Sequence, residues 1–356
     1  MKKIHSLGLM AISFMLVGQG CLGGATTNVA DGGIWRTDNA GGAWTQMSSL
    51  PTATGISSIA GVNVTSIEID PSDDSALYIG TEQNGVLYSI DNGNTWQRPE
   101  SPLAREGSVL DVEVDRTSVC TVYLLKTDSV EKSIDCQRTY KTIYTEGRAD
   151  KTLTTMVLDW FNPSTLWMGT TAGEVLKSQD GGATWSTVYR AEDDVTSILL
   201  SNKDSRVVMI GTNRKGMFRS EDAGATWKSY EKELKNSYES SDEVYSFAQS
   251  ATGDVMIMNS RFGLLASHDQ GLTWTALPII PPPADQRILS VVVSPGNASV
   301  IYYGTLGTLY TSVNGGETWS TVTMPSARLP KAMRVHPSIT DRLFVGFAAI
   351  PKSSLF

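Results

Sequence analysis

Ser178-Gln-Asp-Gly-Gly-Ala-Thr-Trp185 is the stretch of this 356-residue chain that decides its fold, because close copies of it recur along the sequence. Four copies keep the full pattern Ser-x-Asp-x-Gly-x-Thr-Trp, and they span 89–96, 178–185, 220–227 and 267–274. Three copies depart from the pattern and span 37–44, 133–140 and 312–319. Self-similarity at a period of about 45 residues indicates a repeat architecture.

This octapeptide resembles the Asp-box, also called the BNR repeat, and each of its positions has a physical role in a turn. The Asp and Ser side chains bind backbone amides of the turn, and glycine takes a conformation that a β-carbon forbids. Trp buries a large ring against the neighbouring hairpin, so we predict core residues rather than a sugar-binding platform. The residues expected in these structural roles are Asp91, Asp135, Asp180, Asp222, Asp269, Asn314, Trp96, Trp185, Trp227, Trp274 and Trp319.

Each box lies inside a longer unit of four expected strands. Alternating apolar residues predict strands over 64–70 and 76–80, and a third strand over 85–89 leads into the box and a short fourth strand. The same order recurs at 154–185, 195–227, 244–274 and 289–319. Four antiparallel strands repeated around an axis form a propeller blade.

The two ends of the chain supply complementary halves of one blade. The segment from Gly33 has third-strand and box sequence, whereas 332–335 and 342–346 resemble first and second strands without a box. The sequence therefore predicts an all-β fold, a seven-bladed β-propeller over 31–356 whose ring is closed by N- and C-terminal strands in a shared blade.

The first 20 residues are predicted to be a signal peptide. Lys2 and Lys3 precede the apolar segment 7–17, which is too short to cross a bilayer as a mature helix. Cleavage takes the formal net charge from −8 to −10, and an acidic protein lacks the basic surface that a nucleic-acid partner needs.

The signal ends in Gly18-Gln-Gly-Cys21, which resembles the lipobox of bacterial lipoproteins, in which the cysteine is acylated. Cys21 is thus predicted to carry a lipid and 21–30 to be a tether, which places the protein on the periplasmic or extracellular face of a bacterial membrane. The alternative is an ordinary signal peptide cut near Gly20 or Ala25.

Cys120 and Cys136 remain, an even number in an oxidising compartment. If 119–125 and 130–134 are neighbouring strands, the two cysteines lie opposite each other on a hairpin. We predict a disulfide that compensates for the glycine and tryptophan that this box lacks, where Gln137 and Tyr140 stand instead.

Ligand sites in propellers generally use the face opposite the boxes, and the sequence places arginines in the loops of that face. The predicted partner-binding residues are Arg105, Arg148, Arg190, Arg214, Arg261, Arg287 and Arg328. Guanidinium groups bind carboxylates in a bidentate manner, so this ring suits an acidic protein segment. The alternative is that the arginines are solvated or paired with neighbours, for which the candidates are Glu106, Asp150, Glu192, Asp193 and Asp285.

The sequence contains only weak evidence for an enzyme. Arg328-Leu-Pro330 matches a sialidase tripeptide, but at the wrong end of the chain, and xyloglucanases place their catalytic aspartates between two tandem propellers. No histidine has a companion at metal-ligand spacing and no phosphate-binding glycine loop occurs, so no metal, cofactor or catalytic residue is predicted.

A lipobox-like signal joined to a single seven-bladed ring resembles the photosystem II assembly and stability factor family. That resemblance implies a non-enzymatic, membrane-anchored scaffold with a protein partner, an assembly factor for a membrane or envelope complex, and an arginine patch that contacts the partner. The alternative is an extracytoplasmic glycan-active enzyme or glycan-binding propeller, sialidase-like or xyloglucanase-like.

Overall fold

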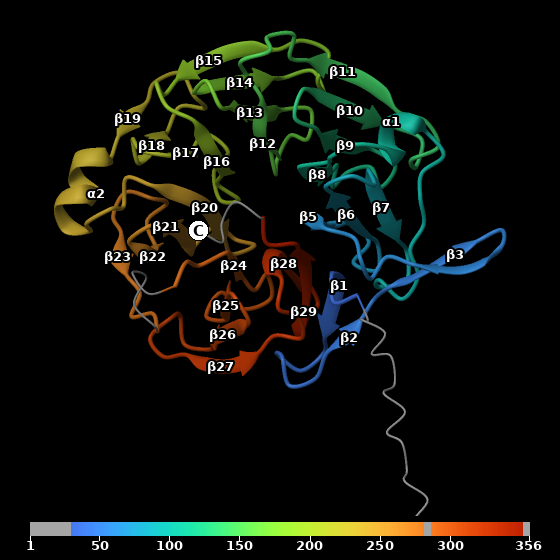
Figure 1. Ribbon diagram of the computed structural model, residues 1–356. Helices are drawn as coiled ribbons and strands as arrows, with labels where there is room; N and C mark the ends of the chain where they lie inside the picture. Colours follow the sequence, from blue (N-terminus) through green and yellow to red (C-terminus); the bar gives the residue numbers. More distant parts are fainter. Residues whose placement is uncertain (1–29, 281–285, 352–356) are drawn as a thin grey trace, which may run out of the picture.

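The computed structural model describes residues 30–280 and 286–351, and it confirms a seven-bladed β-propeller. Figure 1 shows the blades arranged around a central axis, with two short helices at the outer rim. The predicted signal peptide, Cys21 and all but the last residue of the tether lie outside the described residues. Within those residues, no helix is long and apolar enough to cross a membrane.

Blade 1 is the shared blade, as the sequence predicts. Its sheet has the order β2 (Thr45–Gln46), β1 (Gly33–Thr37), β29 (Ile339–Ala348) and β28 (Leu329–His336). The N-terminal strand β1 pairs antiparallel with the C-terminal β29 over five residue pairs, from Gly33 opposite Phe347 to Thr37 opposite Leu343. The ring is therefore closed by backbone hydrogen bonds between the two ends of the chain.

The other six blades follow one another in chain order, and the strands of each blade run in chain order from the axis outward. Blade 2 contains β5 (Val64–Ile69), β6 (Leu77–Thr81) and β7 (Val86–Ser89). Blade 3 contains β8 (Asp111–Val114), β9 (Val122–Leu125), β10 (Ser129–Ser133) and β11 (Lys141–Thr145). Blade 4 contains β12 (Leu153–Leu158), β13 (Leu166–Thr170), β14 (Glu174–Ser178) and β15 (Ser186–Arg190).

Blade 5 contains β16 (Val195–Leu200), β17 (Val208–Thr212), β18 (Met217–Ser220) and β19 (Lys228–Ser229). Blade 6 contains β20 (Val244–Gln249), β21 (Met256–Ser260), β22 (Gly263–Ser267) and β23 (Thr275–Ala276). Blade 7 contains β24 (Ser290–Val293), β25 (Ile301–Thr305), β26 (Thr308–Ser312) and β27 (Ser320–Thr323).

The outer edge of blade 2 departs from the repeat. Its fourth strand is reduced to one antiparallel bridge between Tyr88 and Gln97, because Pro99 has no N–H to donate to the ladder at the next position. The helix α1 (Pro102–Arg105) packs beside β7 instead. A hairpin inserted between blades 1 and 2, β3 (Ser49–Thr52) with β4 (Gly55–Ser58), projects from the rim (Figure 1).

The box turns are held by side-chain hydrogen bonds that recur from blade to blade. In blade 5, Ser220 Oγ donates to Asp222 Oδ1 and accepts from the backbone N–H of Gly224, each at 2.8 Å. Thr226 Oγ1 donates to Asp222 Oδ2 at 2.6 Å, and this bond lowers the pKa of Asp222 to about 2. Gly224 has φ +89°, and a β-carbon there would lie 2.5 Å from Trp167 Cη2 of blade 4, so only glycine fits.

The apolar core lies between blades rather than within them. One cluster joins Ile34 and Phe344 of blade 1 to Ile67, Leu77 and Trp96 of blade 2, all of them fully buried or nearly so. Among the box tryptophans, Trp96 and Trp274 are buried and the others are partly buried against such clusters. Because each core is shared, a blade depends on both neighbours for burial of its apolar faces.

The innermost strands also contact one another around the axis, and hydroxyl groups link them. Thr154 Oγ1 donates to Val195 O at 2.6 Å, and Thr196 Oγ1 donates to Val244 O at 2.7 Å. These bonds use backbone carbonyls of the next blade, so they fix the spacing of successive blades.

Blade 3 keeps the turn geometry despite its degenerate box. Thr139 still bonds to Asp135, and the backbone N–H of Cys136 donates to Cys120 O at 3.2 Å. The predicted hairpin is present, with β9 antiparallel to β10, and the structure joins the two cysteines. Disulfide formation in the purified protein stays a prediction.

The long connection 231–243 between blades 5 and 6 begins with the helix α2 (Glu231–Ser237). Leu234 is its buried residue and packs into the core of blades 5 and 6. The other long connection, 278–286, includes residues 281–285, which lie outside the described part.

We expect the mature, unreduced protein to contain no free thiol at Cys120 or Cys136, as measured by thiol labelling and mass spectrometry. Reduction should lower the unfolding free energy by about 3 kcal/mol, since the cross-link closes a loop of about 15 residues. A double Cys120→Ser, Cys136→Ser variant is the control, and its stability should not respond to reductant. Two labelled thiols in the untreated protein would contradict the prediction.

Candidate functional site

The seven predicted arginines lie on one face of the ring, which we call the loop face. They occupy the connections between blades or between the second and third strands of a blade, and Arg105 and Arg190 are the last residues of α1 and β15. Because the strands alternate in direction, the box turns lie on the opposite face, which we call the box face. The strand order of the structure therefore places the seven predicted arginines on a common surface.

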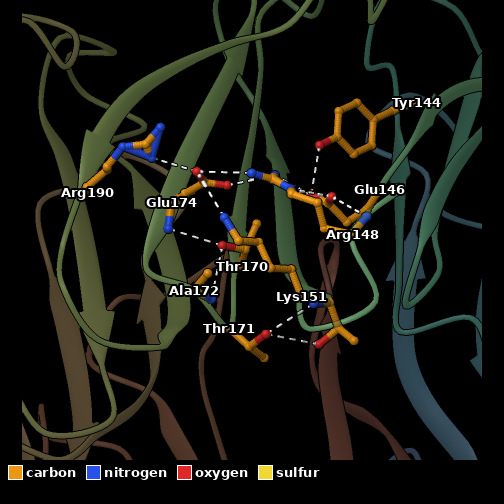
Figure 2. A network of polar contacts seen from close by, with 10 residues as sticks. Tyr144, Glu146, Arg148, Lys151, Thr170, Thr171, Ala172, Glu174 and Arg190 are labelled. Carbon is orange, nitrogen blue, oxygen red and sulfur yellow. Dashed lines mark hydrogen bonds and ion pairs between the residues drawn. The ribbon is translucent and has the colours of Figure 1, made fainter.

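Arg148 and Arg190 converge on the buried carboxylate of Glu174, at the start of β14 (Figure 2). Arg148 Nη2 lies 2.8 Å from Glu174 Oε2, and Arg190 Nη1 lies 2.5 Å from Glu174 Oε1. Arg148 Nη2 also contacts Glu146 Oε2 at 2.6 Å. Lys151 Nζ approaches Glu174 Oε1 at 3.3 Å, so three cations surround two carboxylates.

The network fixes the charge state of its acids. The hydrogen bonds from Arg148 lower the pKa of Glu146 to about 2. Burial opposes ionisation of Glu174, but the bonds from Arg148 and Lys151 outweigh it and lower the pKa of Glu174. Thr170 Oγ1 accepts the backbone N–H of Glu174 at 3.0 Å and so positions the strand start (Figure 2). Both carboxylates are ionised at neutral pH.

Three further arginines of the loop face have carboxylate partners. Arg214 pairs with Asp193 at 3.0 Å and Arg261 with Glu243 at 3.2 Å. Arg328 pairs with Asp31 at 2.9 Å, which fixes the chain where it enters β1. Of the suggested partners that the structure describes, Asp193 is the one that forms a pair, and Asp285 lies outside the described residues.

Pairing leaves much of these guanidinium groups open to solvent. The side chains of Arg190, Arg214 and Arg261 are 61%, 77% and 66% exposed. Arg287 stacks over the ring of Tyr245, with its guanidinium carbon 4.0 Å from the ring centroid. A guanidinium group carries five N–H donors, so these largely exposed groups retain the capacity to bind a partner's carboxylates.

The side chain of Arg105 makes no hydrogen bond or ion pair with any residue that the structure describes, and in this it resembles Arg287. The side chain of Arg98, which is not one of the seven predicted arginines, has no such partner either. Arg98 follows a box and precedes Pro99. It therefore lies neither in a connection between blades nor in one between second and third strands, where the predicted arginines lie. Arg98 and Arg105 line a common groove together with residues of the inserted hairpin.

A second charged cluster lines the central channel. Glu68 on β5, Asp111 and Glu113 on β8, and Arg334 on β28 come from neighbouring inner strands. Arg334 Nη2 lies 3.2 Å from Glu68 Oε2. Burial raises the pKa of Asp111 to about 7, Arg334 opposes that rise and Glu68 adds to it. Among the described residues, no group of three His, Cys, Asp or Glu side chains is arranged to hold a metal ion.

No family model matches the chain, and no curated protein matches it. Solved structures do. A GH74 enzyme from Niastella koreensis has a TM-score of 0.66 at 17% identity, over 81% of this chain and 51% of its own. YCF48 from Cyanidioschyzon merolae has a TM-score of 0.59 at 14% identity, over 80% and 95% of the two chains.

A structure of YCF48 bound to D1 peptide has a TM-score of 0.62 at 14% identity, over 82% of this chain and 94% of that one. At these identities the likenesses show the fold alone. This chain spans about half the length of the GH74 structure that it matches and nearly the full length of YCF48.

The elevated pKa of Asp111 predicts a pH-dependent stability. The folded state holds this proton more tightly than the unfolded chain, whose Asp pKa is about 3.9, so stability falls as pH rises from about 4 to about 7. Asp111→Asn keeps the acceptor for the N–H of Val112 and removes the charge. We expect the variant to be more stable than the wild type by about 1–2 kcal/mol at pH 8, since solvent in the channel screens part of the effect.

Urea unfolding at pH 4.5 and pH 8 measures this difference, which should shrink at the lower pH. An Asp115→Asn variant, altered in an exposed turn beyond β8, is the control and should show no such trend. An equal effect of Asp111→Asn at both pH values would rule out titration of this carboxyl as the cause.

Proposed function

We propose that this protein is a non-enzymatic, membrane-anchored binding protein whose loop face holds a segment of a partner protein, with a role in the assembly of a membrane or envelope complex. The observation that carries the proposal is the set of solvent-exposed guanidinium groups on a face of otherwise ordinary loops. Arginine is enriched among the residues that dominate binding energy at protein interfaces.

The YCF48 structure with a D1 peptide supports this proposal, because it is a propeller of the same fold, nearly fully covered by this chain, with a segment of another protein bound. The Arg261–Glu243 pair is compatible with exchange, because its side chains are 66% and 29% exposed. A partner carboxylate that replaces Glu243 on Arg261 displaces a largely exposed pair worth at most about 1 kcal/mol.

The position at which the chain enters the fold determines which face a lipid anchor at Cys21 would hold near the membrane. Asp31 is held on the loop face by Arg328. If Cys21 carries a lipid, the tether to Asp31 extends at most about 30–36 Å. Such a tether would hold the loop face near the membrane and give it access to membrane-embedded partners.

A glycan-active enzyme is the second candidate, and the GH74 likeness favours it. Glycoside hydrolysis requires a carboxylic acid that is protonated near neutral pH and a second carboxylate about 5–9 Å away. Glu146 and Glu174 do not suit the acid role, because arginines lower the pKa of Glu146 to about 2 and, with Lys151, also lower that of Glu174. This electrostatic setting supports the binding protein.

Crosslinked pull-down from native membranes tests the proposed function. The combined Arg190→Gln, Arg214→Gln, Arg261→Gln variant should lose at least about ten-fold in captured partner, because three exposed donors are removed. Substitution by Gln avoids placing new carboxylates beside Glu174 and Asp193. The matched control is Arg206→Gln, an equally exposed arginine paired with Asp204 on the box face. Undiminished capture by the triple variant would refute the assignment of the loop face.

An assay for reducing sugar released from xyloglucan and other β-glucans tests the second candidate. We expect no release above the level of a heat-denatured sample, because no carboxyl group of the arginine network is protonated at neutral pH. Release that disappears in Glu174→Gln would instead establish the enzyme.

A further inference from the structure

An open groove of about 520 Å³ lies at the outer rim, between the inserted hairpin and the outer edge of blade 2. Figure 1 shows the hairpin that contains β3 extending outward from the ring on the side of β7. The hairpin base is fixed on blade 2 by two bonds from Trp96, whose backbone N–H donates to Ser49 O and whose Nε1 donates to Met47 O, each at 2.9 Å. The groove is therefore a built feature of the fold.

The lining of the groove is basic and contains no carboxylate. It consists of Leu50, Pro51, Thr52, Ser57, Gln97, Arg98 and Arg105. Tyr88 donates its hydroxyl to Gln97 Oε1 at 3.0 Å, which leaves the Nε2 donors of Gln97 without a partner among the described residues. The hydroxyl of Ser57 and two guanidinium groups add further donors, so the groove presents donors and almost no competing acceptor.

The absence of a carboxylate partner distinguishes these two arginines from the five ion-paired arginines of the loop face. Arg98 is half-buried, and a guanidinium group that loses hydration without gaining an ion pair costs free energy. The neighbouring acids Glu100 and Glu106 are exposed and do not line the groove. A second groove, beside α2, has Arg214, Lys235 and Arg261 but also three acids that neutralise them, namely Glu239, Asp242 and Glu243.

We propose that this rim groove is a binding site for an extended acidic peptide segment, whose side-chain carboxylates are held by Arg98 and Arg105. The proposal rests on the proposed function and adds to it the chemistry of the partner and the place where its segment is held. Each guanidinium group offers a bidentate fork to one carboxylate. Carboxylates on alternate residues of an extended chain project on the same side about 7 Å apart, so one segment can present two carboxylates to the same groove.

The apolar part of the groove favours a peptide over a small inorganic anion. Leu50 and Pro51 form one wall, and Ile56, paired with Pro51 across the hairpin, is 81% exposed. An aliphatic side chain next to an acidic residue would bury this surface, whereas a phosphate ion would leave it in water.

Fluorescence anisotropy on the mature full-length protein tests the proposal. The probe is a labelled peptide, Gly-Asp-Leu-Asp-Ser-Gly with blocked ends, and the matched peptide has Asn in place of both Asp residues. We expect binding of the acidic peptide only, weakened by salt. Arg98→Gln and Arg105→Gln should each weaken it at least about ten-fold, and Arg98→Lys should cause a smaller loss because the charge remains without the fork.

Arg206→Gln on the box face is the control and should bind as the wild type does. Thermal unfolding verifies that each variant is folded, and Arg105→Gln, altered at an exposed helix end, keeps the test decisive if Arg98→Gln does not fold. Equal affinity for the two peptides, or unchanged affinity in Arg105→Gln, overturns the proposal. Binding of the wild type to vesicles of anionic phosphatidylglycerol, but not to the peptide, also overturns it and assigns the groove to lipid.

The outcomes separate this site from the proposed function. Unchanged peptide affinity in the Arg98→Gln, Arg105→Gln variant overturns the groove, while partner capture that depends on Arg190, Arg214 and Arg261 still supports the proposed function. Peptide binding that is lost in the double variant supports the groove even when membrane pull-down captures no partner.

Discussion

The pairing of β1 with β29 is the constraint on which the rest of the structure depends. Each apolar cluster lies between neighbouring blades, so the ring completes its burial only when blade 1 is assembled from both ends of the chain. Closure also removes the exposed sheet edges at which an open array would associate with other chains. The two distinct faces follow from it, because strands of alternating direction place every box turn on one side and the longer loops on the other.

The sequence was sufficient to predict this architecture because its rules are local. A turn that needs Ser, Asp and Gly at fixed spacing marks each blade, and even the degenerate box in blade 3 keeps the Ser133 and Asp135 bonds. Departures from the repeat were not predictable in the same way. Pro99 ends the fourth strand of blade 2, but whether a helix, a hairpin or solvent then covers β7 depends on packing. The helix α2 buries essentially Leu234 alone and so carries no strong periodic pattern.

The candidate site was predictable in position but not in its interactions. The loop class of each arginine follows from strand order, and strand order follows from the boxes. Ion pairs such as Arg148 with Glu174, 26 residues apart, join segments that the chain order does not bring together. Arg328 finds Asp31 only because the ring closes. Proximity in sequence suggested Glu106, Asp150 and Glu192, none of which forms a pair with these arginines in the part of the chain that the structure describes, and it also suggested Asp285, which lies outside that part.

Whether an arginine is paired determines what a partner's carboxylate gains from it. On the loop face an incoming carboxylate must compete with Glu174, Asp193 or Glu243, so the net gain from one exchange is small. In the rim groove nothing has to be displaced, and the half-buried Arg98 gains a counter-charge that the fold does not supply. Exposed charges chiefly accelerate and orient encounter, whereas partly desolvated ones retain a bound segment. In the proposed binding protein the two surfaces would therefore differ in their contribution: the loop face would bind a partner by exchange of exposed ion pairs, and the groove would add carboxylate contacts that displace nothing.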